Sequence, residues 1–270
     1  MALKDDSLKV VQTFIGDRFE LSGSNGVILG LSGGLDSAVV LSLCASALDP
    51  KKVTALYMPV GEGNREDLDQ SGELARSLKV NFRVVNIRPT LESVQSHLNG
   101  EVRPFVLGNI AARIRMILLF SEANQRDLMV MGTSNKSELL TGYFTKFGDG
   151  AADLLPIGDL YKTQVRDLAK RLGLPAHFIT KPPSAGLIEG QTDEDDLGVD
   201  YTMLDRILLG YELGMSSDEI IRRTGAEAGV VENVLRRVKN AIHKRNLPAV
   251  PKLGIRTVGL DLREEYLGRQ

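Results

Sequence analysis

Four short apolar runs alternate with helix-like segments along the first half of the chain, and this alternation restricts the fold more than any other feature. The runs cover residues 27–31, 53–58, 82–87 and 128–132. Segments with helical spacing lie between them, at residues 37–48, 64–79, 90–98 and 103–124. Continuous apolar strands are typical of a buried parallel sheet, and strands joined through helices pair in parallel. The pattern therefore predicts an α/β fold, with a doubly wound parallel sheet between two helical layers.

The segments outside this alternation extend the fold without dividing it. We expect an amino-terminal helix at residues 3–20 and a short fifth strand at 154–157. The carboxyl-terminal part is expected to be mainly helical, at residues 162–172, 198–212, 217–224 and 227–245, with a long loop at 174–196. Loops of this length are commonly functional. Since no linker separates these helices from the sheet, residues 1–270 are predicted to form one domain.

A glycine-rich loop joins the first apolar run to its helix. Its residues are Gly30, Leu31, Ser32, Gly33, Gly34, Leu35, Asp36 and Ser37. Glycines let backbone N–H groups approach an anion, the following helix N-terminus adds a positive field, and the serines add hydroxyl donors. Asp36 would repel a phosphate directly, which suggests that Mg²⁺ lies between them. The chain has neither the Gly-Lys of a Walker A loop nor the GxGxxG of a dinucleotide loop. The remaining alternative is a plain turn capped by Asp36 or Ser37.

Composition argues against several other classes of function. The 33 basic and 35 acidic residues leave a net charge of −2, which argues against a strongly basic nucleic-acid binder. The single cysteine, Cys44, permits neither an intrachain disulfide nor a multi-cysteine metal site, and the three histidines lack zinc-protease spacing. We find no signal-peptide core and no apolar run of membrane-spanning length. We therefore expect a cytoplasmic protein without a membrane or nucleic-acid partner.

Three residues near the predicted sheet each have two interpretations. Arg113 lies at the edge of the apolar stripe of the helix at 103–124, which we expect to be buried on most sides. It needs either an internal acid or a bound phosphate or carboxylate. Glu138 is either a charge that stabilises a helix N-terminus or a second Mg²⁺ ligand beside Asp36. Thr133 follows the fourth apolar run, where it can bond adenosine or phosphate.

Further along the chain, five charged residues remain open in the same way. Lys146 and Asp153 flank a glycine-rich segment that is either a solvated loop or a mobile substrate contact. Lys162 begins a helix, where a lysine is usually on the surface. His243 and Lys244 end a helix, where cations suit the helix dipole. Residue types alone favour a surface position for Lys162 and the helix-dipole interpretation for His243 and Lys244, and they leave Lys146 and Asp153 open.

The sequence resembles a known family in several motifs. Residues 32–37 resemble the SGGxDS loop of ATP pyrophosphatases, a superfamily that adenylates a carboxylate or carbonyl oxygen and releases pyrophosphate. Further segments resemble NAD synthetase specifically: GNIAARIRM at 108–116, GTSNKSE at 132–138, GYFTKFGDG at 142–150, KPPSAGL at 181–187 and GQTDE at 190–194. The resemblance extends from about residue 10 to residue 245 and implies an adenine nucleotide alpha hydrolase-like fold.

The resemblance also implies roles for individual residues. ATP is expected to bind the loop from Gly30 to Ser37 together with Thr133, Lys162 and Ser184. Mg²⁺ is expected on Asp36 and Glu138, which with Lys162 form the expected catalytic set. Deamido-NAD is expected to bind Arg113, Lys146, Asp153, His243 and Lys244. The family forms homodimers with the dinucleotide site near the interface, and the apolar helix at 103–124 suits such an interface.

The implied reaction is the ATP-dependent amidation of deamido-NAD by ammonia, which gives NAD, AMP and pyrophosphate through an adenylated carboxylate. Asp149 is one candidate base for ammonium. A built-in glutaminase would need a cysteine nucleophile in a domain of its own, and Cys44 is predicted to be a small core residue of the helix at 37–48. We therefore expect no glutaminase domain, and free ammonia or a separate glutaminase as the nitrogen source.

Three alternatives remain from the sequence. A GMP synthetase-type amidotransferase core shares the SGGxDS loop, but it would need a xanthylate site and usually a distinct dimerisation domain. A tRNA-thiolating enzyme would need further cysteines or a basic RNA surface. A non-catalytic ATP-binding sensor would have no need for Asp36 and Glu138 as a pair of Mg²⁺ ligands.

Overall fold

The computed structural model describes residues 3–183, 192–258 and 261–262, and its centre is a four-stranded parallel sheet. The strands are β1 (Gly26–Gly30), β2 (Val53–Tyr57), β3 (Asn81–Val84) and β4 (Leu128–Val130), in the order β3-β2-β1-β4. β1 is central: its Val27 pairs with Val53 on one side and with Met129 on the other. All pairs are parallel, which confirms the predicted sheet.

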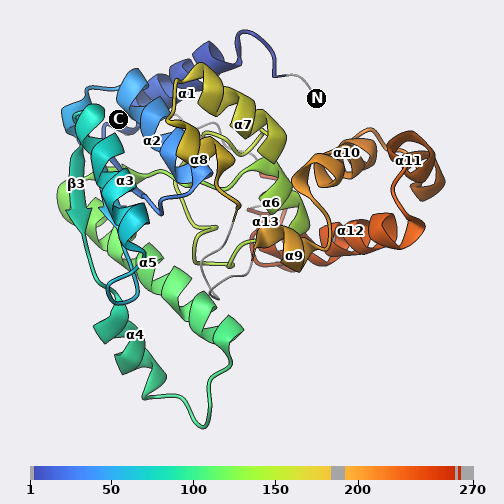
Figure 1. Cartoon of the computed structure of the whole chain (residues 1–270). Coiled ribbons are helices and arrows are strands. Elements are labelled where there is room, and N and C mark those ends of the chain that lie inside the picture. The colour runs from blue at the N-terminus through green and yellow to red at the C-terminus, as the bar shows by residue number, and fades with distance from the viewer. Residues whose placement is uncertain (1–2, 184–191, 259–260, 263–270) are drawn as a thin grey trace.

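Helices cover both faces of the sheet, as the alternation predicts. Val27 and Leu29 pack into a core with α1 (Ser7–Ser22), α2 (Leu35–Ala47), α3 (Arg65–Ser77) and α7 (Lys162–Arg171). Ile28 points to the other face, where α4 (Arg88–Gln95) and α5 (Pro104–Arg126) form a second core. This division follows from the two-residue period of a strand. The fold is doubly wound (Figure 1).

Two predictions about the connecting segments are wrong. The expected strand at 154–157 is reduced to a single bridge between Leu154 and Met131. The expected third strand at 82–87 ends at Val84, because Asn86 turns the chain by accepting N–H groups from Gly61 and Arg88. For the same reason, α4 begins at Arg88, two residues before the start predicted for this helix.

The expected loop at 174–196 also contains regular structure. Its described part includes α8 (Ala176–Thr180) and α9 (Asp193–Leu197). Two further short elements complete the connections, the 3-10 helix η1 (Pro50–Lys52) and α6 (Lys136–Thr141). Helices of one or two turns carry too little periodicity to be recognised from sequence.

The carboxyl-terminal helices gather on one side of the sheet (Figure 1). They are α10 (Tyr201–Glu212), α11 (Ser217–Thr224), α12 (Ala228–Asn240) and α13 (Ile242–Arg245), and the first three share a core of their own. The helix predicted from residue 198 begins at Tyr201, because Gly198 is left-handed and Asp200 caps the first turn. The helix predicted at 227–245 is divided at Ala241.

α5 differs from its prediction in its burial. One face packs on β1, β4 and α4, but Phe105 is 65% and Ile117 is 56% exposed, so burial on most sides is wrong for this chain. Among the described residues, α5 is also the one helix long and apolar enough, by length and composition, to cross a membrane. This corrects the expectation that no run reaches that length. Its packing against the sheet makes it a core helix of the α/β fold.

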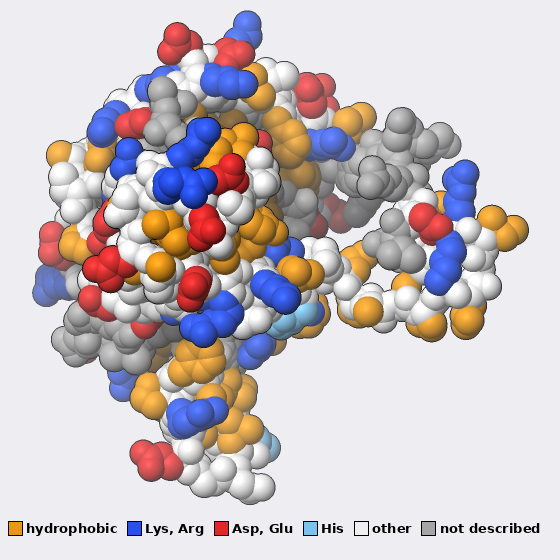
Figure 2. Space-filling view, turned by 90° about the vertical axis from the view of Figure 1, so that its right-hand side faces the viewer, with side chains coloured by type: hydrophobic (Ala, Val, Ile, Leu, Met, Phe, Trp, Pro, Cys, Tyr) orange, Lys and Arg blue, Asp and Glu red, His pale blue; other side chains and the backbone are white. Residues whose placement is uncertain are grey.

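Two sequence expectations about charge and cysteine can be compared with the structure. On the face shown in Figure 2, acidic and basic side chains are interspersed rather than gathered into one basic patch. Cys44 lies fully buried on α2, and burial raises the pKa of its thiol to about 12. The prediction that Cys44 is a core residue is confirmed.

Candidate active site

The carboxyl ends of β1 and β4 adjoin at the point where the strand order reverses. The chain leaves β1 into the glycine-rich loop and leaves β4 into α6. Open α/β sheets bind ligands at this topological switch point. The fold therefore brings residues 30–37 and 131–138 to one edge, although about a hundred residues separate them in sequence.

Internal hydrogen bonds shape the glycine-rich loop. The Ser37 hydroxyl donates to the Gly34 carbonyl (3.0 Å) and accepts the Ser32 N–H (3.2 Å), while the Gly34 N–H donates to the Ser32 hydroxyl (3.3 Å). α2 begins at Leu35, and no described side chain caps it at Gly34. The first N–H groups of α2 therefore have no capping side chain at Gly34, which suits an anion. Ser37 also bonds within the turn, as the alternative of a capped turn expects, so the anion-binding role of the loop stays a prediction.

Gly33 is required by both its conformation and its surroundings. Its φ is +80°, and a Cβ there would lie 2.7 Å from the Asp67 Cβ. Asp67, on α3, forms an ion pair with Lys181, and the Lys181 amine also donates to the Gly33 carbonyl (3.4 Å). This pair supports the loop from outside and places a further cation beside it.

Asp36, Glu138 and Lys162 meet beside the loop, and we call them the carboxylate–lysine centre. The Lys162 Nζ forms an ion pair with Asp36 and lies 3.4 Å from the Glu138 Oε1. The Lys162 side chain is only 4% exposed, so the interpretation as a surface lysine is wrong. A buried ammonium is tolerated only with such partners. The structure thus brings all three predicted catalytic residues together.

Asn135 holds the two carboxylates in place. This fully buried residue donates from Nδ2 to the Asp36 Oδ1 (3.2 Å) and accepts the Glu138 N–H (3.0 Å). The Glu138 Oε2 in turn accepts the Asn135 N–H (3.2 Å), which completes a capping box. Glu138 therefore stabilises its helix N-terminus and contacts Lys162 at the same time. Sequence analysis missed Asn135, although the Asn-x-x-Glu spacing signals such a cap.

Two carboxyl groups share one cation in the centre. Burial and the charge of Asp36 raise the pKa of Glu138, despite the opposing effect of Lys162. Burial lowers the pKa of Lys162, but the two carboxylates outweigh it and raise that pKa above its usual value. The ammonium is therefore firmly protonated, whereas Glu138 takes up a proton more readily than a free carboxyl group does.

Asp193 and Tyr201 border the centre, and sequence analysis assigned neither a role. The Tyr201 ring is fully buried with its centroid 5.2 Å from the Lys162 Nζ, and its hydroxyl donates to the Asp193 Oδ2 (3.1 Å). Burial raises the pKa of Asp193, and the charge of Lys162 opposes that rise. The GQTDE motif, which contains Asp193, was the available signal.

A second group of predicted residues meets at some distance from the sheet, and we call Arg113, Lys146, His243 and Lys244 the basic cluster. The Arg113 Nη2 donates to the Lys146 carbonyl (3.3 Å), and the Lys146 Nζ donates to the His243 carbonyl (2.5 Å). The Lys244 Nζ donates to the carbonyls of Gly142 (2.7 Å) and Phe144 (2.6 Å). Neutral carbonyls hold these cations, so their charge stays available to an anion.

Arg113 is less buried than the sequence predicts. Arg113 is exposed and bonds a carbonyl, so the internal acid partner that was one of its interpretations is not observed among the described residues. Burial lowers the pKa of Lys244, the charge of Asp149 opposes this effect, and Arg113 adds to it. Asp149, the candidate base, is itself bonded by the Thr145 N–H (2.9 Å).

The described contacts link neither Asp153 nor Thr133 to the two groups. The Asp153 carboxylate accepts the Val130 N–H (2.7 Å) at the outer edge of β4, and no described contact joins it to the basic cluster. Thr133 lies half-buried after β4, on the expected side of the sheet. Ser184 falls outside the described residues. The roles of these residues therefore stay predictions.

The donor set for a metal consists of Asp36 and Glu138. Among residues 3–183, 192–258 and 261–262, no three His, Cys, Asp or Glu side chains are arranged to hold a metal ion. Mg²⁺ commonly takes one or two protein carboxylates and completes its octahedron with water and phosphate oxygens. The pair fits a Mg²⁺ that arrives with a nucleotide, but not a metal held by protein groups alone.

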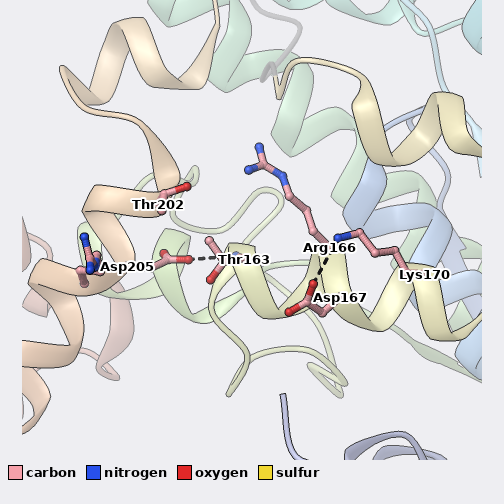
Figure 3. Close-up of a pocket in the computed structure, with 7 residues that line it drawn as sticks. Thr163, Arg166, Asp167, Lys170, Thr202 and Asp205 are labelled. Atoms are coloured by element: carbon pink, nitrogen blue, oxygen red, sulfur yellow. Dashed lines mark hydrogen bonds and ion pairs between the residues drawn. The ribbon is translucent and has the colours of Figure 1, made fainter. Parts of the chain in front are cut away.

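A cavity of about 310 Å³ lies between α7 and α10, away from these residues (Figure 3). Thr163, Arg166 and Asp167 line it from α7, and Thr202 and Asp205 line it from α10. None of the residues predicted for the site lines this cavity. Its importance for the site lies in Asp205, which contacts the start of α7.

Comparisons with known proteins agree with this geometry. The NAD synthase family model matches residues 7–248. An NH(3)-dependent NAD(+) synthetase from Thermococcus kodakarensis is 44% identical over 247 residues, which cover 91% of this chain and 96% of the relative. A solved NMN synthetase from Francisella tularensis has a TM-score of 0.82 and 34% identity, covering 92% of this chain and 98% of that one. An NH3-dependent NAD synthetase from Campylobacter jejuni has a TM-score of 0.80 and 33% identity, covering 93% and 100%.

Proposed function

The chain belongs to the NAD synthase family, and we propose that it amidates deamido-NAD with ammonia while converting ATP to AMP and pyrophosphate. The observation that carries this proposal is Lys162, buried between Asp36 and Glu138 beside the uncapped start of α2. The GMP synthetase-type, tRNA-thiolating and sensor alternatives are not favoured, because the relatives match nearly the whole chain.

The reaction proceeds in two balanced steps. A carboxylate oxygen of the nicotinate attacks the α-phosphorus of ATP, and the bond to pyrophosphate breaks. Ammonia then attacks the activated carbonyl carbon, AMP leaves with the carboxylate oxygen, and a proton is lost. The loop amides and Lys162 neutralise charge on the phosphates, so no side-chain nucleophile is needed.

Mg²⁺ completes the ATP side of the proposal. Asp36 and Glu138 would hold it, and its chemistry when bound is to neutralise phosphate charge. The carboxylates now share Lys162, so ATP binding requires Lys162 to shift toward the phosphates. Support comes from the geometry of the centre, where two carboxyl groups meet at one point beside the uncapped start of α2.

The basic cluster supplies the other substrate site. Arg113, Lys146 and Lys244 present cations that donate to backbone carbonyls and form no ion pair among the described residues, and these suit the pyrophosphate of a dinucleotide. Ammonia as the direct nitrogen donor is supported by Cys44, because the one cysteine of the chain is buried with a raised pKa. A separate glutaminase remains compatible with this proposal.

The similarity to an NMN synthetase gives a second candidate acceptor. The same two steps on nicotinate mononucleotide would give NMN. Deamido-NAD is favoured, because an acceptor with a pyrophosphate uses more of the basic cluster than a monophosphate does. A direct comparison of kcat/KM for the two acceptors separates the candidates.

We also propose that two copies associate through α5. Phe105 and Ile117 are large apolar side chains of this helix that are more than half exposed, and exposed apolar surface can mark an association site. Family resemblance favours a second copy of the chain as the partner. Light scattering in solution is expected to give twice the 29.5 kDa mass of the chain, and a monomer mass would contradict this part of the proposal.

The central experiment measures NAD and pyrophosphate from purified protein with ATP, Mg²⁺, ammonium and deamido-NAD. We expect equal amounts of both products, and Asp36→Ala is expected to abolish both. Asp69→Ala is the matched control, because Asp69 is 67% exposed in a surface ion pair and should not matter. Pyrophosphate release with a different acceptor only, or turnover by Asp36→Ala, would overturn the proposal.

A further inference from the structure

One buried carboxylate contacts both helices that carry the centre. Glu138 lies in the first turn of α6, and Lys162 is the first residue of α7. Asp205, on α10, is 1% exposed and accepts the Ser137 hydroxyl (2.5 Å) and the Thr163 N–H (2.9 Å). The Ser137 oxygen in turn accepts the backbone N–H of Lys162 (3.0 Å). A continuous hydrogen-bonded chain therefore joins the starts of α6 and α7.

We propose that Asp205 is a positioning residue for the adenylation step, because it fixes the start of α7 against the start of α6. The first N–H groups of a helix have no partner within the helix. Here the first two of α7 are bound through Ser137 and Asp205, which belong to two other helices. The separation of Lys162 and Glu138 is thus set by α10.

The location of Asp205 supports a specific role. Asp205 follows Leu204 of the carboxyl-terminal core and also lines the cavity beside Arg166, and it is buried, so an unbonded carboxylate there would be costly. Both of its oxygens are used, each for a different helix. Glu212 links the same two helices through Lys136 and Tyr161, but it does so at the surface and through side chains. Asp205 alone in the described part of α10 contacts a backbone N–H of α7.

Figure 3 also provides a matched control. Asp205 reaches Thr163 from one wall of the cavity, while Asp167 pairs with Lys170 at 3.4 Å on α7 itself. Both carboxylates line the same cavity, but the Asp167 pair is exposed and distant from the first turn of α7. Asp205→Asn and Asp167→Asn therefore make the same chemical change, but only Asp205 contacts the start of α7.

The first test does not depend on activity. Hydrogen exchange of a peptide covering the first turn of α7 is expected to accelerate in Asp205→Asn and to stay at the wild-type rate in Asp167→Asn. The amide is uncharged and keeps only one accepting oxygen, so the bond to the Thr163 N–H loses its charge assistance, and the Ser137 hydroxyl must turn to accept from the amide. Unchanged exchange in Asp205→Asn would overturn the proposal.

The second test rests on the proposed function. Asp205→Asn is expected to lower kcat for pyrophosphate release by about 10²-fold, the effect of a small misplacement, with KM for deamido-NAD unchanged. Asp167→Asn is expected to keep the wild-type kcat. A wild-type protein that fails to make NAD would count against the proposed function, whereas a wild-type kcat in Asp205→Asn would count against Asp205.

A second variant keeps the proposal testable if Asp205→Asn folds poorly. Ser137→Ala removes the bridging hydroxyl and leaves the contact between Asp205 and Thr163. We expect the same selective fall in kcat, and a double variant no slower than the more affected single variant, because both act through one chain of bonds. Multiplied losses in the double variant, or a parallel rise in KM for deamido-NAD, would show that Asp205 does not act through Lys162.

Discussion

The carboxylate–lysine centre and the basic cluster hold their charges in different surroundings. In the centre, Lys162 is 4% exposed and is paired with two carboxylates. In the basic cluster, Arg113 is exposed, and Lys146 and Lys244 donate to backbone carbonyls. The cation of the centre is therefore paired directly with carboxylates, whereas the described hydrogen bonds of the cations in the basic cluster go to backbone carbonyls.

This difference suggests how each region meets a phosphate. Cations held by carbonyls keep their full charge for an incoming anion, so the basic cluster is ready to bind without exchanging ionic partners. Lys162 must leave a carboxylate to bind a phosphate. We expect this exchange to be favourable only when another cation takes the place of Lys162 beside Asp36 and Glu138. Under the proposed function, we therefore expect binding of the dinucleotide to depend mainly on the cluster and the chemical step to depend on the centre.

Removing the lysine of the centre is expected to have the largest effect. Lys162→Met leaves Asp36 and Glu138 buried without a counter-ion, so the free energy of unfolding should fall by roughly 3–5 kcal/mol. The rate of pyrophosphate release should fall by about 10³-fold, since the cation no longer meets the phosphates. Lys162→Arg retains the charge and should recover most of the stability. A Lys162→Met enzyme within tenfold of the wild-type rate would show that the centre is not catalytic.

Removing a lysine of the basic cluster should act on binding alone. Lys244→Ala loses a charged donor, and KM for deamido-NAD should rise by about 10- to 100-fold with kcat nearly unchanged. Lys239→Ala is the matched control, because this exposed lysine ends the neighbouring helix α12. A fall in kcat at constant KM would remove the distinction between the two regions.

The smallest effect is expected for thiol labelling of Cys44, on the helix that follows the glycine-rich loop. Because burial raises the pKa of Cys44 to about 12, the folded protein should not react with a thiol reagent near pH 8. The unfolded chain should react with one equivalent. Rapid labelling of the folded protein, measured by mass spectrometry, would show that the burial around the centre does not extend to α2.

The two regions also differ in how well sequence predicts them. The glycine-rich loop is local, and its glycines, serines and Asp36 could be recognised within eight residues. Lys162 could not be placed from its surroundings, because its partner Asp36 lies 126 residues away. Only the resemblance suggested that the two residues act together. Residue type alone favoured a surface lysine, and the fold overrides that preference by bringing β1 and β4 together.

Errors elsewhere have a common physical cause. The prediction of a fifth strand at 154–157 is wrong because Leu154 pairs with the chain after β4 through a single bridge, and no ladder of hydrogen bonds follows. Arg113 was misplaced because an apolar helix does not reveal which of its faces packs on the sheet. Asp205 was overlooked because its role depends on contacts with Ser137 and Thr163, and the sequence does not show that these residues lie beside it.

The most direct test of the account follows the oxygen atoms of the acceptor. Deamido-NAD labelled with ¹⁸O in its nicotinate carboxylate is incubated with the protein, ATP, Mg²⁺ and ammonium, and AMP is analysed by mass spectrometry. If the centre adenylates the carboxylate, each AMP should carry one carboxylate oxygen, and none should appear with Asp36→Ala. Unlabelled AMP formed together with NAD would contradict the adenylation mechanism proposed for this site.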